Sequence, residues 1–436
     1  MVHMQIEFQS IAIDRGFTLH VAPTDKFKTT SIRLVLRRSL RADTYTKNAV
    51  IPFVLRRGTR KLPTARDIAR HLENLYGAEF AVDINKIGET QNIELFLDVA
   101  NERFLPEQLG MTEAALAFLG EVLLDPAMEN GAFRREYVTQ EAEALRRRIE
   151  SLINNKPQYA LNRLREEMCR DEPFGLHKYG NVDELRQVTA EELFNHYHHV
   201  LATSPVDVFV VGPVEPDRVT EWVKERLPLP RGLVETPPAV AGPDPPARAE
   251  RTVFEEQPVQ QGVLALGYRT GTRYPDGDYA ALLMYNGLLG GFPHSKLFVN
   301  VREKASLAYF ASSQLEASKG VLWVVAGIAV EKYEQALAII REQVAAMADG
   351  RFTDQELENT RKGLINGVLS AQDSPGRIIG GRLVGIVNGR VRPVQETIAA
   401  LEGVTREDVV RVAERIRPDT VYFLRTPQAP PGKEGH

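Results

Sequence analysis

Short stretches of alternating apolar and polar residues predict β-strands in both parts of the chain. In such a stretch one face of the strand is apolar and the other polar, because successive side chains point to opposite faces. The first part has three of these stretches, at residues 17–21, 32–36 and 92–99. The second part has three apolar stretches of similar length, at residues 263–267, 307–315 and 321–326.

Longer segments between these strands have the spacing of helices, and they recur in the same order. We expect helices at residues 45–55 and 136–152 in the first part, and at residues 279–289 and 354–369 in the second. Near the end of each part, Thr189 and Thr405 each precede acidic residues at the start of a helix, as N-terminal capping residues do. A last strand follows each capped helix, at residues 206–211 and 421–424.

A proline-rich segment separates the two parts. Seven of the 26 prolines lie between residues 228 and 246, where no apolar period is present. Such a segment favours an extended polyproline linker. The matching element order predicts an α+β protein of two homologous α/β-sandwich halves in tandem, rather than two unrelated domains. The expected divisions are residues 1–227, a linker at 228–250, residues 251–426 and a disordered tail at 427–436.

Composition indicates an ordinary globular protein. Hydrophobic residues make up 43% of the 436 residues and charged residues 26%, with a net charge of -4. This small net charge gives no electrostatic reason to expect nucleic acid or an anionic membrane as a partner. The single cysteine, Cys169, excludes an internal disulfide and a cysteine-based zinc cluster. With no signal peptide or long apolar run in view, a cytoplasmic protein is expected.

The stretch from Gly290 to Tyr309 carries the most informative motif. The glycine pair Gly290-Gly291 is predicted to open a short helix, with Arg302 near its end and Tyr309 seven residues later, at the start of a strand. This order resembles the C-terminal half of peptidase family M16, which includes the insulinase, pitrilysin and mitochondrial processing peptidases. The resemblance implies the fold of the LuxS/MPP-like metallohydrolases, with the arginine and tyrosine holding substrate over a zinc ion bound elsewhere.

The zinc half of that machinery is absent from the sequence. Family members of this kind bind zinc through H-x-x-E-H, in which two imidazoles hold the metal and the glutamate activates water. No H-x-x-E-H occurs, and counting back from Arg57-Gly58-Thr59 puts Ala49, Pro52 and Phe53 in the three functional positions. None of these side chains can bind zinc or transfer a proton. For the third ligand, the resemblance points to Glu143 or to residues 148–150, and we expect no zinc site in this chain.

Two other groups of residues resemble metal ligands. His71 and Glu73 reproduce part of the motif, but they are expected on the surface of a helix capped by Thr64. Glu192, His196 and His199 have the i, i+4, i+7 spacing of one helix face, which can hold a metal. Histidines at this place also interact favourably with a helix C-terminus without any metal.

The resemblance predicts a non-catalytic, substrate-binding subunit of an M16-type zinc metallopeptidase. Arg302 can anchor a peptide carbonyl or carboxylate, and the Tyr309 phenol can stabilise an oxyanion. Gly290 and Gly291 either let a peptide backbone approach or end the preceding helix. Zinc is expected in a partner subunit, an H-x-x-E-H-bearing homologue that forms a heterodimer with this chain and acts on a peptide substrate; pairing of identical chains stays open.

Two alternatives remain at this point. The first is a structural or assembly protein derived from the peptidase fold, in which Arg302 and Tyr309 have no function. The second is a stand-alone metallopeptidase with a non-standard metal site at Glu192, His196 and His199. The sequence does not identify the peptide substrate.

Overall fold

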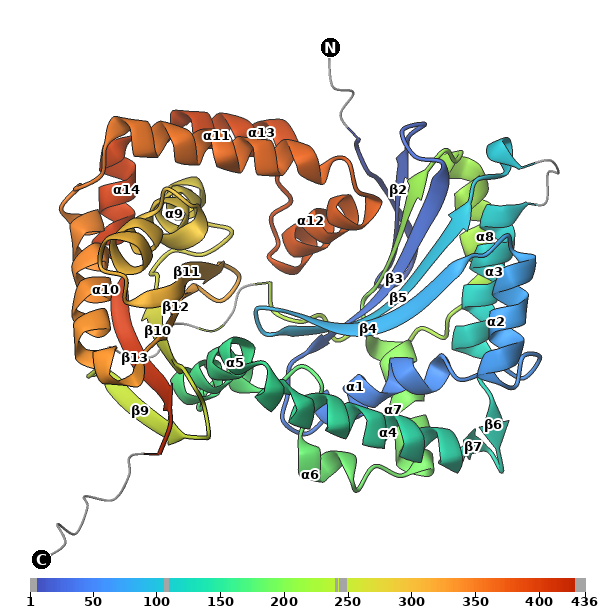
Figure 1. Cartoon of the computed structure of the whole chain (residues 1–436). Coiled ribbons are helices and arrows are strands. Elements are labelled where there is room, and N and C mark those ends of the chain that lie inside the picture. The colour runs from blue at the N-terminus through green and yellow to red at the C-terminus, as the bar shows by residue number, and fades with distance from the viewer. Residues whose placement is uncertain (1–5, 106–109, 240–241, 243–248, 428–436) are drawn as a thin grey trace, which may run out of the picture. The chain divides into compact units, whose positions relative to one another are not determined.

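The structure of the chain is a computed structural model that describes residues 6–105, 110–239, 242 and 249–427. These residues form two compact units. The first unit contains residues up to Glu150, Leu176–Ala239 and Ala371–Val387, and the second contains Ser151–Gly175, Val240–Ser370 and the residues from Asn388 onward. Each unit is an α+β sandwich of one main sheet with helices on both faces (Figure 1), as the sequence pattern predicts.

The first unit is built on a six-stranded sheet in the order β1-β2-β8-β3-β5-β4. Its strands are β1 (Gln9–Asp14), β2 (Phe17–Pro23), β3 (Thr29–Ser39), β4 (Glu79–Ile87), β5 (Thr90–Ala100) and β8 (Val206–Gly212). Its helices are α1 (Tyr45–Leu55), α2 (Ala65–Asn74), α3 (Met111–Leu124), α4 (Arg135–Glu150), α6 (Val182–Leu185), α7 (Ala190–Thr203), α8 (Pro216–Arg226) and α12 (Pro375–Val387). A small hairpin is formed by β6 (Met128–Glu129) and β7 (Ala132–Phe133).

The second unit is built on a five-stranded sheet in the order β11-β12-β10-β13-β9. Its strands are β9 (Arg251–Glu256), β10 (Gly262–Arg269), β11 (Ala308–Glu316), β12 (Val321–Ile328) and β13 (Arg417–Arg425). Its helices are α5 (Lys156–Met168), α9 (Tyr279–Asn286), α10 (Tyr333–Ala348), α11 (Asp354–Ala371), α13 (Val394–Gly403) and α14 (Arg406–Ala413). Two π-helical turns, at Gly287–Gly291 and Phe298–Lys304, precede β11.

The two sheets have the same topology. Reading from β4 in the first unit and from β11 in the second gives β4-β5-β3-β8-β2 and β11-β12-β10-β13-β9. The two pairs at the far end, β2 with β8 and β9 with β13, are the parallel pairs of these sheets. The correspondence strand by strand confirms the prediction of two homologous halves, and β1 is an addition to the first.

Two helices are exchanged between the halves of the sequence. The helix α5 comes from the first half but packs on β10, β12 and β13 of the second unit, whereas α12 comes from the second half and packs on β3 and β8 of the first unit. Both follow a long charged helix, α4 or α11, so they occupy equivalent places in the two halves. The two compact units therefore have other bounds than the domains expected at residues 1–227 and 251–426, and those domain bounds stay predictions.

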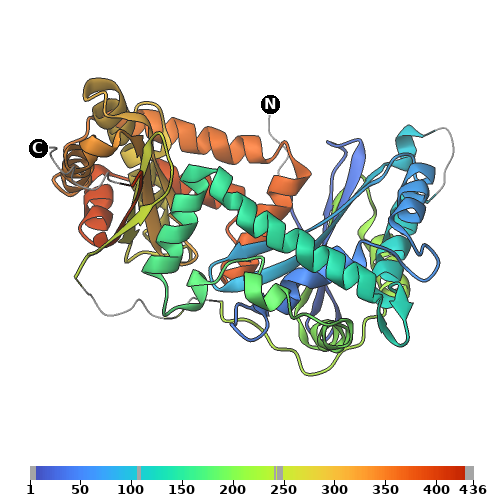
Figure 2. The same cartoon turned by 60° about the horizontal axis from the view of Figure 1, so that its bottom comes forward.

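Successive side chains of a strand point to opposite faces of its sheet, so apolar residues lie on both faces and helices cover both. On β10, Leu264 and Leu266 belong to the core shared with α10 and α14, whereas Val263 and Ala265 contact α5. Figure 2 shows the strands of the second unit between α5 and the helices on the other face. The sheet of the first unit likewise has its main core on one face and α12, through Ile379 and Leu383, on the other.

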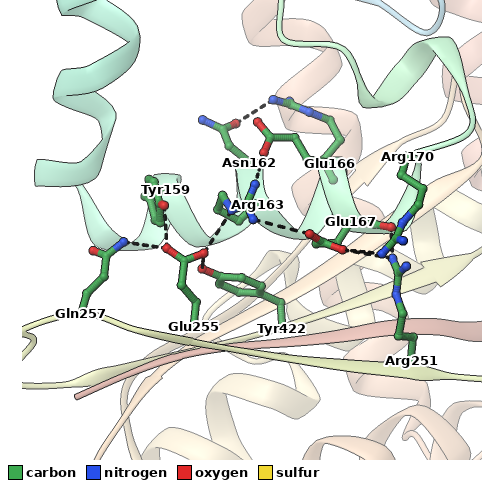
Figure 3. Close-up of polar contacts among 11 residues, drawn as sticks. Tyr159, Asn162, Arg163, Glu166, Glu167, Arg170, Arg251, Glu255, Gln257 and Tyr422 are labelled. Atoms are coloured by element: carbon green, nitrogen blue, oxygen red, sulfur yellow. Dashed lines mark hydrogen bonds and ion pairs between the residues drawn. The ribbon is translucent and has the colours of Figure 1, made fainter. Parts of the chain in front are cut away.

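A network of hydrogen bonds centred on Glu255 fastens α5 to the edge of the second sheet (Figure 3). The Glu255 carboxylate accepts hydrogen bonds from the Tyr159 hydroxyl at 2.6 Å, the Tyr422 hydroxyl at 2.8 Å and the Arg163 guanidinium at 3.1 Å. Burial and the neighbouring Glu255 raise the pKa of Tyr159 to about 12. Because these donors come from α5 and β13 and the acceptor from β9, the network fixes where the exchanged helix lies within its unit.

The described part of the proline-rich segment packs on the first unit. Leu229 is buried, and the Arg231 guanidinium donates hydrogen bonds to the carbonyls of Leu201 and Ser204 at 2.6 and 2.5 Å. Residues 228–239 form neither helix nor strand. Residues 240–241 and 243–248 of the predicted linker, and 428–436 of the predicted tail, lie outside the described residues.

Candidate functional site

The three motif positions without zinc ligands lie on α1, inside the first unit. Ala49 is fully buried, Phe53 is 5% exposed, and both belong to the main core. The Phe53 ring packs edge-to-face against the Tyr179 ring, with centroids 6.4 Å apart. Pro52 is also buried within the helix. These residues have become part of the hydrophobic packing of α1, so the helix face that would carry zinc ligands now stabilises the fold.

A buried carboxylate beside α1 is that of Glu141, which belongs to no sequence motif. It is 6% exposed on α4 and accepts a hydrogen bond from Arg57 at 3.1 Å, just beyond the end of α1. Glu143, which the resemblance indicates as a possible third ligand, is partly exposed and pairs with Arg146 at 2.6 Å. It is two positions from Glu141, which on a helix rotates the side chain by about 200°. The helical spacing of α4 places Glu141 on the same buried face as Tyr137, Val138 and Leu145, so its burial follows from the sequence pattern.

A hollow of about 580 Å³ opens between the edge strand β4 and the helices α1 and α4. We call it the β4 hollow; its lining residues are Phe53, Arg56, Ala81, Val82, Asp83, Phe96, Asp98, Glu141, Ala144, Leu145 and Arg148. One of them, Phe53, is a position of the missing zinc motif. The outermost strand β4 pairs only with β5 within the described sheet, so its other edge has backbone groups without a strand partner. An extended peptide can pair with such an edge.

Arg302 and Tyr309 lie in the second unit and are both exposed. Arg302 is in the π-helical turn Phe298–Lys304, with its guanidinium 4.5 Å from the centre of the Phe298 ring. Tyr309 is 75% exposed and lies at an irregularity in the pairing of β11 with β12. No hydrogen bond joins the Tyr309 hydroxyl to another described residue. Packing therefore gives no reason for a phenol at this position.

The two glycines of the motif differ from each other. They end the helical segment that begins with α9, and the helix bearing Arg302 starts only after residues 292–295, so the prediction that they open that helix was wrong. Gly290 is buried, and a Cβ atom there would lie 2.4 Å from the backbone nitrogen of Ser313 on β11. The absence of a side chain at Gly290 therefore lets the backbone pack closely against β11. Gly291 is the exposed member of the pair.

The histidine-rich face of α7 is held by hydrogen bonds and ion pairs. His196 hydrogen-bonds through Nε2 to the Asn48 side chain at 2.7 Å, and His199 pairs with Glu235 at 3.3 Å. Glu192 interacts with its capping residue Thr189. Burial lowers the pKa of His196 to about 4. Over the residues that the structure describes, no three His, Cys, Asp or Glu side chains are grouped so that they could hold a metal ion.

The partial motif on α2 has a structural explanation. Thr64 caps this helix in a reciprocal capping box with Asp67, as the sequence indicates. Glu73 is exposed, as expected. His71 is only half-exposed, because its ring stacks on Phe118 with centroids 5.3 Å apart.

Across the described residues, no helix has both the length and the apolar character needed to cross a membrane.

Comparison with known proteins agrees with this arrangement. A family model described as "Peptidase M16 inactive domain" matches residues 187–364. The "Probable inactive metalloprotease YmfF" of Bacillus subtilis is 38% identical over 413 residues, which cover 94% of this chain and 96% of that relative.

Solved structures show the same fold over nearly the whole chain. A conserved protein from Enterococcus faecalis V583 superimposes with a TM-score of 0.89 at 29% identity, covering 97% of this chain and 99% of the other. A "peptidase M16 inactive domain" from Pseudomonas fluorescens has a TM-score of 0.77 at 18% identity and covers 97% and 99% of the two chains. At that identity the second match shows the fold alone. These findings support a non-catalytic protein of peptidase fold, and the chain belongs to the peptidase M16 family.

Proposed function

We propose that this chain is the peptide-binding, non-catalytic subunit of an M16-type zinc metallopeptidase. In this function an H-x-x-E-H-bearing homologue supplies the zinc and the water, and this chain supplies Arg302 and Tyr309. The observation that carries the proposal is the exposure of Tyr309, which is 75% and leaves its hydroxyl free for a ligand. Tyr309 lies on the edge strand β11, where an extended peptide that pairs with this edge can contact the phenol.

The chemistry of the pair fits peptide binding and cleavage. The guanidinium of Arg302 is permanently charged and can hold a peptide carbonyl or carboxylate in register. The Tyr309 phenol can donate a hydrogen bond to the oxyanion that forms when a zinc-bound water attacks a peptide bond. Neither residue can activate that water, so the reaction needs the second subunit.

The β4 hollow supports the same function in the first unit. It lies beside a strand with an unpaired edge, and its lining contains apolar and charged side chains from several elements. A peptide strand added along β4 would place alternate side chains toward the hollow. The former zinc region is thus suited to binding without being suited to hydrolysis.

A mixing experiment tests the proposal. Peptidase activity is measured for this chain, for a candidate H-x-x-E-H homologue, and for both together. We expect activity only in the mixture, and a loss of about 10²-fold when this chain carries Tyr309→Phe, from removal of an oxyanion donor. Arg302→Ala is expected to raise the KM of the mixture. If the homologue alone matches the mixture, the proposal fails.

Matched substitutions separate a specific role from a general surface effect. Lys304→Ala removes an exposed cation two residues from Arg302, and Tyr76→Phe removes the hydroxyl of a tyrosine that is 46% exposed. Both are expected to leave the activity of the mixture unchanged. A structural or assembly role for this chain predicts instead that the Arg302 and Tyr309 variants behave like these controls.

A further inference from the structure

We propose that the β4 hollow selects peptides in which an apolar residue and an acidic residue lie two positions apart. This inference rests on the proposed function, because it assumes that an extended peptide lies along β4. The apolar side chain enters the hollow, and the acidic one pairs with Arg56 at its rim.

The lining of the hollow combines six apolar residues with five charged ones. Phe53, Val82 and Leu145, which belong to the main core, form its apolar floor, whereas Phe96 lines it from the opposite face of the sheet. Phe53 and Leu145 are almost completely buried and therefore fixed, while the Phe96 ring is covered on one face by the Arg33 guanidinium at 4.5 Å. The lining also contains two exposed alanines, whose small side chains leave the space open. A volume of about 580 Å³ exceeds that of any single side chain, and an apolar residue with its peptide backbone fits such a space.

The carboxylates of the hollow already have partners within the protein. Asp83 accepts a hydrogen bond from the Tyr179 hydroxyl at 2.8 Å and lies 3.6 Å from the Arg148 guanidinium. Asp98 accepts a hydrogen bond from the Ser31 hydroxyl. Glu141 pairs with Arg57 at 3.1 Å. An incoming cation would have to compete with these donors, so the hollow offers little to a basic peptide.

Arg56 differs from the other charged residues of the lining. It is exposed at the C-terminal end of α1, and no ion pair joins it to a carboxylate of the described residues. Its guanidinium lies 5.9 Å from the centre of the Phe53 ring, so the positive charge is held next to the apolar floor. Side chains two positions apart in an extended peptide lie on the same side, so a carboxylate at Arg56 keeps the side chain two positions away within reach of the floor. The arrangement therefore favours an apolar residue and an acidic residue separated by one residue.

A set of four labelled peptides tests this selectivity by fluorescence anisotropy. The peptides share one extended ten-residue background and differ at two central positions that are separated by one fixed residue; the four pairs are written Leu-Glu, Leu-Lys, Ser-Glu and Ser-Lys. We expect Leu-Glu to bind best. Replacing Leu by Ser should weaken binding about tenfold, from lost apolar burial. Replacing Glu by Lys should weaken it about threefold to fivefold, with a salt dependence that the other change lacks.

Two substitutions assign the selectivity to the hollow. Arg56→Glu is expected to reverse the charge preference, so that Leu-Lys binds more tightly than Leu-Glu. Ala144→Trp fills the hollow from an exposed position and should reduce the Leu peptides to the affinity of the Ser peptides. Arg66→Glu makes the same charge change on α2, at an exposed residue outside the lining, and should leave all four affinities unaltered.

The outcomes distinguish this inference from the proposed function. If the four peptides bind equally, or if Arg56→Glu leaves the preference unchanged, the selectivity is refuted. Equal binding that is still lost with Arg302→Ala would preserve the proposed function. Failure of all four peptides to bind at any concentration tested would overturn both.

Discussion

The region of the missing zinc motif and the region of the Arg302–Tyr309 pair differ in exposure: the first is buried and the second faces the solvent. On α1, Ala49 and Phe53 are buried in the main core of the first unit. On the second unit, Arg302 and Tyr309 are exposed, and the contact of Arg302 with the Phe298 ring is the one polar or ring interaction that their side chains make with described residues. Side chains at the first place are explained by the stability of the fold, and side chains at the second are not.

This difference indicates what kind of change each region tolerates. A buried helix face that no longer binds a metal is free to take apolar residues, because burying them stabilises the protein. An exposed arginine and an exposed tyrosine contribute little to the stability of the fold, so we infer that a ligand explains their presence. Stability is therefore expected to respond strongly to substitutions on α1 and weakly to substitutions of Arg302 and Tyr309.

The largest expected effect is that of Phe53→Ala. Removing a buried ring should lower the free energy of unfolding by about 3 kcal/mol, the lower end for such changes, because the space joins the β4 hollow and can fill with water. Urea unfolding measures it, with Arg66→Ala as an exposed control expected within about 0.5 kcal/mol of the wild type. A change below about 1 kcal/mol for Phe53→Ala would mean that the α1 face is not structural.

A somewhat smaller loss is expected for Gly290→Ala. The new Cβ atom would lie 2.4 Å from the Ser313 nitrogen, and overpacking of this kind costs about 1–3 kcal/mol. At Gly291 the nearest atom, the carbonyl oxygen of Asn286, would be 3.3 Å away, so Gly291→Ala should cost less. Thermal unfolding of the two variants gives the order directly. Equal melting temperatures would contradict the difference in packing between the two glycines.

Acid sensitivity provides a third test near α1. The pKa of His196 is lowered to about 4 by burial, below its unfolded value of about 6.5. The unfolded chain therefore binds the proton more tightly, and His196 should reduce stability progressively as the pH falls from about 6.5 toward about 4. A glutamine side chain can still donate to Asn48 but does not titrate, so His196→Gln should flatten this part of the profile. Urea midpoints at pH 7, 6, 5 and 4 measure it, and an unchanged slope would contradict the assignment.

The smallest effect on stability is expected for Arg302→Ala combined with Tyr309→Phe. Both side chains are exposed, so the free energy of unfolding should stay within about 0.5 kcal/mol of the wild type. Urea unfolding of the double variant measures this, in parallel with the peptidase assay of the mixture. A loss of more than about 1 kcal/mol would show that the pair supports the fold, and the contrast with α1 would disappear.

Much of the fold follows from local sequence patterns. The helix predicted at residues 45–55 is α1 with the same bounds, and the capping residues Thr189 and Thr405 start α7 and α14 as expected. The edge strands β1, β4 and β9 were not predicted. Each has only one neighbour and a partly exposed side, so its hydrophobic pattern is weak.

The packing partners of the helices could not be predicted from the sequence in the same way. An apolar stripe on α5 or α12 predicts that the helix is buried, but it does not say against which sheet, so the exchange between halves could not be inferred. At the candidate site, the spacing of Arg302 and Tyr309 was evident from the sequence, whereas Arg56 and Phe96 carry no motif. Their proximity follows from the packing of α1 beside β4 and β5, which only the structure shows.

The exchange of α5 and α12 has a consequence for how the chain can be divided. A cut within residues 228–250 would leave an N-terminal piece that lacks α12, the cover for one face of its sheet, and a C-terminal piece that lacks α5. Each piece alone would expose a sheet face rich in valine and aromatic residues to water. Proteolytic nicking there should therefore yield two fragments that stay associated, and neither should be recoverable as a folded protein without the other.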